Sequence, residues 1–330
     1  MSIKEEVVKN SSRQVIRYAF TAMDDILAAH HGEKWKQYRK RWTDTQNINE
    51  LSNIPLYLLL ELNSFCNLRC KMCKHADDNQ SMERESMSIE VFDKIIRECR
   101  DLDIPSINIG TGTECTLHPK FNEIVEKVKY SGAIDKFFLT NGTTLSENMI
   151  NRIFTGEYER VEISVDAATR ETYEKIRVNG NYEKLEKMIL KLIDEKKKRR
   201  MNLPIIRLSF CVQNDNIDEI DMFYNKWENK VDLIEYQKVS SYPSADQILE
   251  PKVTKCLQPF NRMTINYRGD IFACCSILYQ DRFCLGNIRD MSIYEAWHSE
   301  KMNKLRNSFI NGNLIQHCRE CLVSVYGGVN

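Results

Sequence analysis

Residues 55–73 read PLYLLLELNSFCNLRCKMC, an apolar run that leads directly into a group of three cysteines. Leucine occupies every second position from 56 to 62, and a period of two predicts a strand over residues 56–63. The cysteines that follow, Cys66, Cys70 and Cys73, have the spacing C-x3-C-x2-C. Thiolates packed this closely select zinc or iron–sulfur clusters. The stretch therefore predicts a buried strand followed by a loop that binds metal.

Five more strands with alternating apolar residues are expected downstream, separated from one another by helical patterns. With the first strand, they cover residues 56–63, 107–110, 136–140, 161–166, 205–213 and 233–239. Strands that alternate with helices favour a parallel sheet with crossover helices. A strand-and-helix unit takes roughly 30 residues, so six units fit between residues 55 and 240 but eight do not. The sequence predicts an α/β fold, a partial (β/α)6 TIM-like barrel over residues 55–245.

One face of these strands is polar, although the interior of a closed barrel is filled by branched apolar side chains. We therefore expect an incomplete barrel whose lumen holds a hydrophilic substrate. Glu61, Glu162 and Arg207 are candidates for accepting a proton or contacting this substrate, and pairing with one another is the alternative. The polar residues expected in the lumen are Glu61, Asn63, Asn108, Glu162, Ser164, Asp166, Arg207, Ser209 and Gln213.

The composition excludes several classes of protein. The 330 residues include 47 Lys and Arg and 47 Asp and Glu, so the chain lacks the net charge of a nucleic-acid or anionic-membrane binder. The longest apolar run, residues 54–60, is too short to span a bilayer, and charged Lys4, Glu5 and Glu6 stand where a signal peptide would be apolar. Twelve cysteines without an export signal argue against structural disulfides. We expect a cytoplasmic protein.

The two ends of the chain are expected to add smaller units to the barrel. Residues 1–54 predict a helical extension because Ile16, Ala19, Met23 and Ile26 recur at helical spacing. A packing role is favoured for it, and docking of a partner is the alternative. Residues 246–330 predict a small domain with a hairpin around Gly269 and a helix that begins with a capping box at Ser292 and Glu295. So small a domain needs a metal to stabilise it, and four cysteines are available: Cys256, Cys274, Cys318 and Cys321.

Each cysteine group has a zinc alternative. His75 could complete a Cys3His zinc site with the first group, whereas a four-iron cluster on three thiolates leaves one iron open. Cys99 is not a ligand candidate, because it falls at a core position of a predicted helix. The second group contains one C-x2-C knuckle, and zinc ribbons use two. We favour a 4Fe–4S cluster in the first group, and the single knuckle of the second group argues against zinc there.

Four short motifs follow the first cysteine group in a fixed order: Gly112-Thr113-Glu114, Thr140-Asn141-Gly142, Ser164 and Arg177. With Met72 before the third cysteine, this order resembles the radical S-adenosylmethionine (SAM) superfamily, and Thr113 replaces a glycine of its pattern. The C-terminal part resembles the short twitch form of the SPASM extension, in which a glycine precedes the second cysteine of the auxiliary group, as Gly269 precedes Cys274.

The resemblance implies a role for each motif. Cys66, Cys70 and Cys73 would hold a 4Fe–4S cluster whose open iron binds SAM, and Cys256, Cys274, Cys318 and Cys321 an auxiliary 4Fe–4S cluster. Glu114 would hold the methionine amino group, and Ser164 and Arg177 its carboxylate. The full set of implied SAM contacts is Met72, Gly112, Thr113, Glu114, Asn141, Ser164 and Arg177.

The resemblance also implies the chemistry. One electron, from a flavodoxin- or ferredoxin-type donor, cleaves SAM to methionine and a 5′-deoxyadenosyl radical that removes hydrogen from a small polar substrate. The cysteine spacing of the second group is similar to that of the dehydrogenase acting on 2-deoxy-scyllo-inosamine. This favours oxidation of an alcohol to a ketone, on a carbohydrate or aminocyclitol, with the auxiliary cluster as electron acceptor.

Three other functions stay open. An epimerase would need an unligated cysteine as hydrogen donor, and Cys211, expected in the lumen, is the first candidate before Cys115, Cys275 and Cys284. A peptide-modifying enzyme is the second possibility, although the chain lacks an obvious peptide-capturing extension. The third is a cluster- or zinc-binding interaction protein without catalysis, against which the motifs at Glu114, Ser164 and Arg177 argue.

Overall fold

The computed structural model describes residues 2–9, 16–19, 22–45, 47, 50–73, 75–76, 84–239, 250–278 and 280–329. The expected domain boundary between residues 245 and 246 lies outside these ranges. None of the described helices is long and apolar enough to cross a membrane.

Six parallel strands form the centre of the molecule, in the spatial order β9-β8-β6-β5-β4-β2. Each coincides with one of the six strands expected from the sequence, so the predicted parallel sheet is confirmed. Its outer neighbours are β1 beyond β9 and β11 beyond β2, and the described sheet does not close on itself. The strands are β2 (Tyr57–Leu60), β4 (Ser106–Asn108), β5 (Asp135–Thr140), β6 (Arg160–Ser164), β8 (Ile205–Val212) and β9 (Leu233–Lys238).

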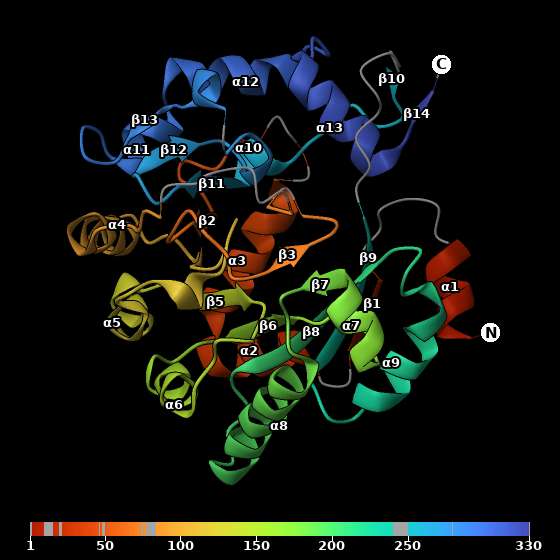
Figure 1. Cartoon of the computed structure of the whole chain (residues 1–330). Coiled ribbons are helices and arrows are strands. Elements are labelled where there is room, and N and C mark those ends of the chain that lie inside the picture. Colours follow the sequence, from red (N-terminus) through yellow and green to blue (C-terminus); the bar gives the residue numbers. More distant parts are fainter. Residues whose placement is uncertain are drawn as a thin grey trace.

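Helices cover the outer face of this sheet (Figure 1). In α4, Phe92, Ile95, Ile96 and Cys99 recur at i, i+3, i+4 and i+7, and all four are buried in the main core, which confirms Cys99 as a core residue. The helices are α4 (Ile89–Asp101), α5 (Phe121–Lys127), α6 (Glu147–Thr155), α7 (Arg170–Ile176), α8 (Tyr182–Lys198) and α9 (Ile220–Trp227). Short 3-10 turns lie at Cys115–Leu117, Val128–Ser131, Ile217–Glu219, Cys275–Ile277 and Asp281–Phe283.

The N-terminal extension is helical except for one strand. It contains α1 (Ile3–Lys9), β1 (Ile16–Ala19), α2 (Met23–His31) and α3 (Glu33–Asp44). The prediction that Ile16 and Ala19 belong to a helix is therefore wrong. The segment pairs antiparallel with β9, and the Tyr18 ring packs edge-on against Tyr224 and Tyr236. An edge strand offers a row of unpaired backbone groups, and local periodicity carries no information about that partner.

The C-terminal part continues the same sheet. β11 (Arg262–Ile265) runs parallel to β2, and β12 (Asp270–Phe272) and β13 (Gly286–Asn287) follow antiparallel, so the expected hairpin is confirmed. Gly269 adopts a φ of +88° in its turn, where a side chain would be strained. The capping box at Ser292 and Glu295 forms, but the helix that it opens ends at Trp297 and a second one begins. The remaining elements are β10 (Glu250–Pro251), α10 (Gln258–Asn261), α11 (Ile293–Trp297), α12 (Glu300–Ile310), α13 (Gln316–Tyr326) and β14 (Gly328–Val329).

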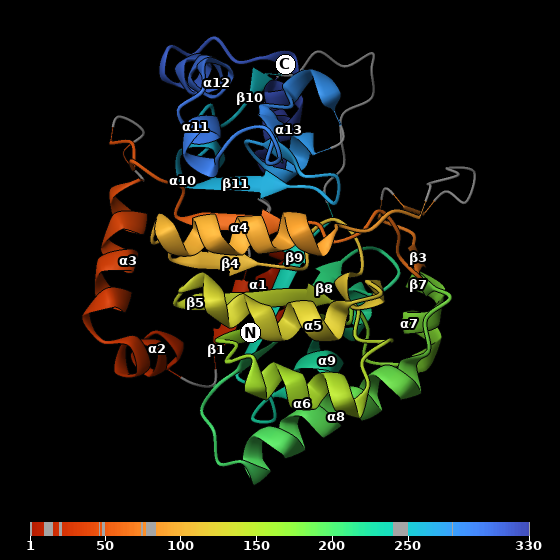
Figure 2. The ribbon, with the colours of Figure 1, turned by 90° about the vertical axis from the view of Figure 1, so that its left-hand side faces the viewer.

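The sheet has two functionally different ends. At the carboxyl ends of the strands, β3 (Arg69–Cys70) pairs with β7 (Arg177–Val178), which places Cys70 opposite Arg177. At the amino ends lie α2 and α3 (Figure 2). In barrels of this kind, catalytic residues gather at the carboxyl ends.

Candidate active site at the carboxyl ends of the strands

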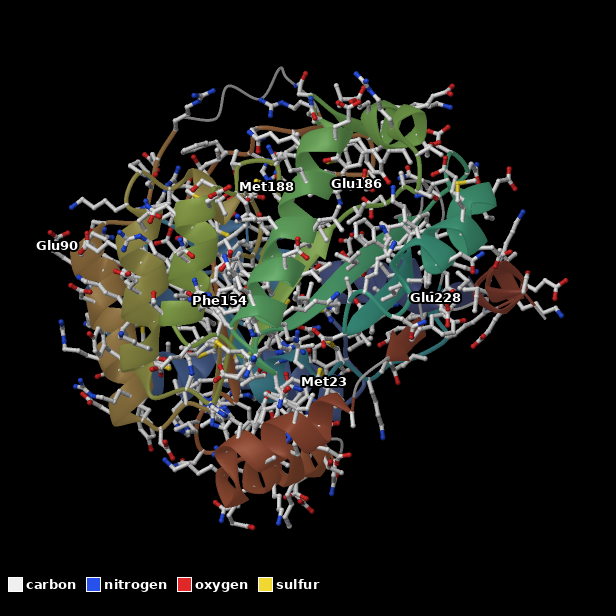
Figure 3. All side chains as sticks on the ribbon, turned by 90° about the horizontal axis from the view of Figure 1, so that it is seen from below. Met23, Glu90, Phe154, Glu186, Met188 and Glu228 are labelled. Atoms are coloured by element: carbon white, nitrogen blue, oxygen red, sulfur yellow. The ribbon has the colours of Figure 1, made fainter. Side chains whose placement is uncertain are left out.

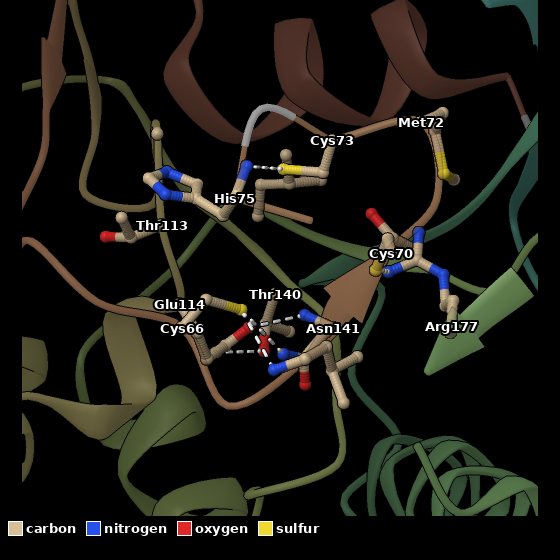
Figure 4. A pocket seen from close by; sticks show the side chains of 14 residues that line it. Cys66, Cys70, Met72, Cys73, His75, Thr113, Glu114, Thr140, Asn141 and Arg177 are labelled. Carbon is tan, nitrogen blue, oxygen red and sulfur yellow. Dashed lines mark hydrogen bonds between the residues drawn. The ribbon is translucent and has the colours of Figure 1, made fainter. Parts of the chain in front are cut away.

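The three cysteines of the first group line one cavity of about 190 Å³ at the carboxyl ends of the strands (Figure 4). Cys66 lies in the loop after β2, Cys70 in β3 and Cys73 in the turn that follows. The same cavity is lined by every residue that the resemblance assigned to SAM: Met72, Gly112, Thr113, Glu114, Asn141, Ser164 and Arg177. Segments more than 100 residues apart in the chain thus meet in one place.

The described thiols do not converge at the spacing that a single zinc ion requires. Four thiolates at the zinc–sulfur distance of about 2.3 Å from one ion would lie about 3.8 Å apart. Among the described residues, no three cysteine sulfurs lie within 4.8 Å of one another; the one group of potential ligands that does is His30, His31 and Glu159. Glu159 also binds the Lys136 ammonium at 2.9 Å, which disfavours a metal cation there. His75 lines the cysteine cavity and donates its backbone N–H to Cys73 Sγ.

Burial controls the protonation of two of these thiols, Cys70 and Cys66. It raises the pKa of Cys70 to about 11, against the opposing effect of the Arg177 guanidinium, whose Nη1 lies 3.8 Å from Cys70 Sγ. Burial also raises the pKa of Cys66. Metal binding requires thiolates and releases their protons, so Arg177 is placed to favour the form that binds metal.

Glu114 joins two of the predicted motifs. Its carboxylate accepts hydrogen bonds from the backbone N–H of Asn141 and the hydroxyl of Thr140, both at 2.6 Å, and from Thr116 Oγ1 at 2.5 Å. Burial raises the pKa of Glu114, and these donors oppose that effect. Thr113, which departs from the family's glycine, donates its hydroxyl to the Asn63 carbonyl at 2.5 Å. The threonine at this position therefore adds a hydrogen bond to the end of the strand that precedes the cysteines.

Arg177 is held by a buried carboxylate whose role the sequence did not reveal. Asp166 accepts from Arg177 Nη2 at 2.6 Å and Nε at 2.9 Å, and from the backbone N–H of Cys211 at 2.7 Å. It is 1% exposed and has a φ of +67°, a strained conformation for aspartate. The sequence placed Asp166 in the lumen, but nothing local in it indicated Arg177 as its partner.

The four residues proposed from the sequence as catalytic do not gather at this cavity. Glu162 and Arg207 face a second cavity nearer the amino ends, where Arg207 pairs with both Glu162 and Glu235, and Arg160 pairs with Glu162. Glu61 is fully buried at the seam of β2 and β11, where its N–H donates to the Ile265 carbonyl. For Glu162 and Arg207, the structure shows the pairing that was the alternative to a catalytic role.

Cys211 lies half-buried at the end of β8, beside Asp166. The other possible hydrogen donors lie elsewhere: Cys115 is buried in the core and donates to the Leu139 carbonyl, and Cys284 donates to the Gly286 carbonyl. Cys211 is therefore linked to the first cavity through Asp166 and Arg177, whereas Cys115 adjoins two of its lining residues, Glu114 and Leu139, from the core side.

The second cysteine group also comes together. Cys318 and Cys321 belong to α13, Cys256 precedes α10 and Cys274 follows β12. Burial and the neighbouring thiols raise the pKa of Cys256 to about 11 and of Cys318 to about 12, and Ser276 donates its hydroxyl to Cys321 Sγ at 3.3 Å. The exposed Cys275 is a fifth thiol of this group that the sequence did not assign as a ligand.

The sequence matches two known families. A model described as the radical SAM superfamily matches residues 60–226, and a model of an iron–sulfur cluster-binding domain, SPASM, matches residues 256–322. Together these domains imply a 4Fe–4S cluster and an auxiliary cluster, with SAM bound at the first.

The similar proteins have diverse activities. GTP 3′,8-cyclase of Clostridium perfringens is 24% identical over 179 residues, which are 54% of this chain and 53% of that protein. The chain spans about half the length of this and other curated relatives that it matches. Among solved structures, BtrN in complex with AdoMet and 2-DOIA has a TM-score of 0.52 at 15% identity, covering 79% of this chain and 89% of BtrN. Streptococcus suis SuiB bound to its precursor peptide SuiA has a TM-score of 0.58 at 12% identity, covering 82% and 71%. At these identities the likeness shows the fold alone.

Proposed function

Since the chain belongs to the radical SAM superfamily, we propose that it is an oxidoreductase that converts an alcohol of a small polar ring, a carbohydrate or aminocyclitol, into a ketone. Hydrogen leaves the alcohol carbon to the 5′-deoxyadenosyl radical, which becomes 5′-deoxyadenosine. The hydroxyl proton and one further electron must then leave for the ketone to form. A flavodoxin- or ferredoxin-type protein is the proposed source of the electron that initiates turnover.

The observation that carries this proposal is that both cysteine groups flank one polar lumen. β11 pairs with β2 and β12 leads to Cys274, so the second group stands on the sheet that encloses the lumen. When bound, the first cluster supplies the electron that cleaves SAM, and the auxiliary cluster offers an acceptor for the electron left on the substrate carbon. An oxidation needs such an acceptor, because one electron must leave the substrate for the ketone to form.

The chain's own residues hold SAM and take up the proton. We assign the methionine amino group to Glu114, and the carboxylate to Ser164 and Arg177, because all three line the cysteine cavity. Glu61 and Glu162 are the proposed acceptors of the hydroxyl proton. Burial raises the pKa of Glu162, against Arg207 and Arg160, which makes its carboxylate a stronger base.

Asp166→Asn is expected to weaken SAM binding by about tenfold to 100-fold, because a hydrogen bond to a charged group contributes about 1.5–3 kcal/mol. The asparagine can accept from Arg177 but cannot neutralise it, so Arg177 loses the fixed position beside Cys70. The measurement is SAM affinity of the cluster-loaded protein by equilibrium dialysis, with iron content determined in parallel.

Asp215→Asn is the matched control. Asp215 pairs with Lys71 and Lys175 on the surface, where ion pairs contribute little. The affinity of the Asp215→Asn protein for SAM should equal that of the wild type. Equal affinities for Asp166→Asn and the wild type would mean that Arg177 does not depend on Asp166.

The net reaction is tested by turnover in deuterium oxide, with 2-deoxy-scyllo-inosamine and related aminocyclitols and sugars as probes. Oxidation predicts a product lighter by two hydrogens and one 5′-deoxyadenosine for each product, both measured by mass spectrometry. The probes extend to the precursor peptide class of SuiB. A protein that cleaves SAM but modifies only peptides would contradict the proposed substrate class.

Epimerisation is the second candidate, supported by the place of Cys211. Its backbone N–H donates to Asp166 at the carboxyl end of β8, and its thiol would return hydrogen to the substrate radical. This predicts an isomer of unchanged oxidation state that carries deuterium from solvent at carbon. Cys211→Ala would then abolish the isomer, whereas under the proposed oxidation it would leave ketone formation in place.

A further inference from the structure

A second cavity of about 550 Å³ lies at the amino ends of the barrel strands. It is enclosed by the sheet and by α2 and α3, and Met23 at the start of α2 marks its place when the molecule is seen from below (Figure 3). The two cavities follow one another along the same strands: Phe137 and Glu162 line this one, and Leu139 and Ser164 line the cysteine cavity. Two residues of strand span roughly 7 Å, so a ligand here would sit next to SAM.

The inner carboxylates of this cavity are paired with arginines of the protein. Asp135 binds Arg160 at 2.7 Å, and Glu235 binds Arg207 at 2.8 Å. Glu162 binds both arginines. Each of these three acids therefore has a guanidinium partner, and the two arginines are shared among them.

Arg262 is different from the other inner arginines. Within the described part of the chain it has no carboxylate partner, and only its Nε is engaged, donating to Asn261 Oδ1 at 3.1 Å. The face of its guanidinium lies over the Tyr57 ring, 5.0 Å from the centroid, and near Trp42, at 5.7 Å. Stacking and the Nε bond fix the plane of the group and leave the four N–H bonds of Nη1 and Nη2 for a ligand. A fixed guanidinium fork matches the two oxygens of a carboxylate or phosphate.

The walls beside Arg262 suit the body of a ring. Tyr57 stacks on Phe137 with centroids 5.6 Å apart, and Trp42 lies edge-on to Tyr57. Arg160 covers Phe137, with its Cζ 3.7 Å from the ring centroid, so these rings are already stacked, and the 550 Å³ beside them is an ordinary size for a small-molecule site. Arg262 also lies near the second cysteine group along the chain, because it follows directly after α10, the short helix that Cys256 precedes.

We propose that this cavity binds the substrate and that the substrate carries an oxyanion, a carboxylate or phosphate, held by the Nη fork of Arg262. The inference rests on the proposed function, since it takes the occupant to be the molecule that is oxidised. It adds that the substrate is an acidic rather than a neutral or purely cationic ring compound. The acid group then lies on the side of Cys256, and the remainder of the ring extends toward the cysteine cavity.

The test measures binding without turnover. Cluster-loaded full-length protein with SAM, but without reductant, is titrated with D-glucuronate, D-glucose 6-phosphate, D-glucose and D-glucosamine by calorimetry. We expect at least one of the two acids to bind about tenfold or more tightly than glucose. Arg262→Gln should remove that preference, and Arg262→Lys should retain part of it, because it keeps the charge and loses the fork.

Arg268→Gln is the matched control. Arg268 also stacks on a tyrosine, Tyr267, at 5.3 Å, but lies at the exposed turn of the same hairpin and pairs with Glu85. The Arg268→Gln protein should keep the preference for acids over glucose. The inference is overturned if neither acid binds more tightly than glucose, if glucosamine binds best, or if Arg262→Gln with wild-type iron content keeps the preference.

The same titration separates this inference from the proposed function. Binding of acids that depends on Arg262, in a protein that forms no ketone with reductant, would support the site and contradict the oxidation. Ketone formation from a neutral ring, with no preference for acids, would support the oxidation and overturn the site.

Discussion

Cys70→Ala is expected to abolish formation of 5′-deoxyadenosine. Cys70 is one of three thiols in the cysteine cavity, and a four-iron cluster that is left with two thiolates is not retained. The iron content should fall from about eight to about four atoms per chain, because the auxiliary group is untouched. The measurements are iron analysis after anaerobic reconstitution and chromatography of SAM cleavage products after reduction.

Cys99→Ala is the control for a cysteine that is buried but not a ligand. Cys99 packs in the core side of α4, and its thiol donates to the Ile104 carbonyl at 3.7 Å. Loss of this side chain should cost about 1 kcal/mol of stability and leave iron content and SAM cleavage unchanged. Normal SAM cleavage by Cys70→Ala would refute the open-iron site. An iron content of this variant equal to that of the wild type, with zinc retained, would refute it as well.

Arg207→Met is expected to lower the free energy of unfolding by about 3–5 kcal/mol, the usual cost of removing one partner from a buried ion pair. Arg207 neutralises Glu162 and Glu235, and the side chains of these acids are 4% and 7% exposed. Without it, Glu162 keeps its ion pair with Arg160, and Glu235 loses its ion pair with Arg207. Denaturant unfolding of wild-type and variant proteins with equal iron content measures the difference.

The loss of stability caused by Arg207→Met should depend on pH. Burial raises the pKa of Glu162 already in the wild type, and removal of Arg207 raises it further. An acid whose pKa is higher in the folded state binds protons on folding, so the variant regains stability as the pH falls from 8 toward 5.

Arg199→Met serves as the surface control. Arg199 pairs with Glu195 on the same helix face, where such a pair contributes well under about 1 kcal/mol, and should show no comparable pH dependence. A loss of less than about 1 kcal/mol in the free energy of unfolding of Arg207→Met would mean that the ion pairs of Arg207 with Glu162 and Glu235 do not stabilise the fold. Arg207 would then again be a candidate for binding substrate.

The N-terminal strand β1 was not predicted from the periodicity of the sequence. Ile16, Ala19, Met23 and Ile26 follow helical spacing, and only the last two lie in a helix. Secondary structure near an unpaired sheet edge depends on that edge as much as on local spacing. The strand β9 that fixes β1 lies more than 200 residues away, so no local pattern could indicate it.

Local patterns were sufficient for the strands and for the cysteine groups. Alternation of apolar side chains is a property of a few neighbouring residues, and the spacing of ligands within a loop is another, so both can be read before the chain folds. The tertiary structure decided which polar residues meet. It paired Asp166 with Arg177, engaged Glu162 with Arg207, and left the guanidinium fork of Arg262 in a cavity. Charges select their partners through space, and the distances between them are set only when strands far apart in the chain become neighbours.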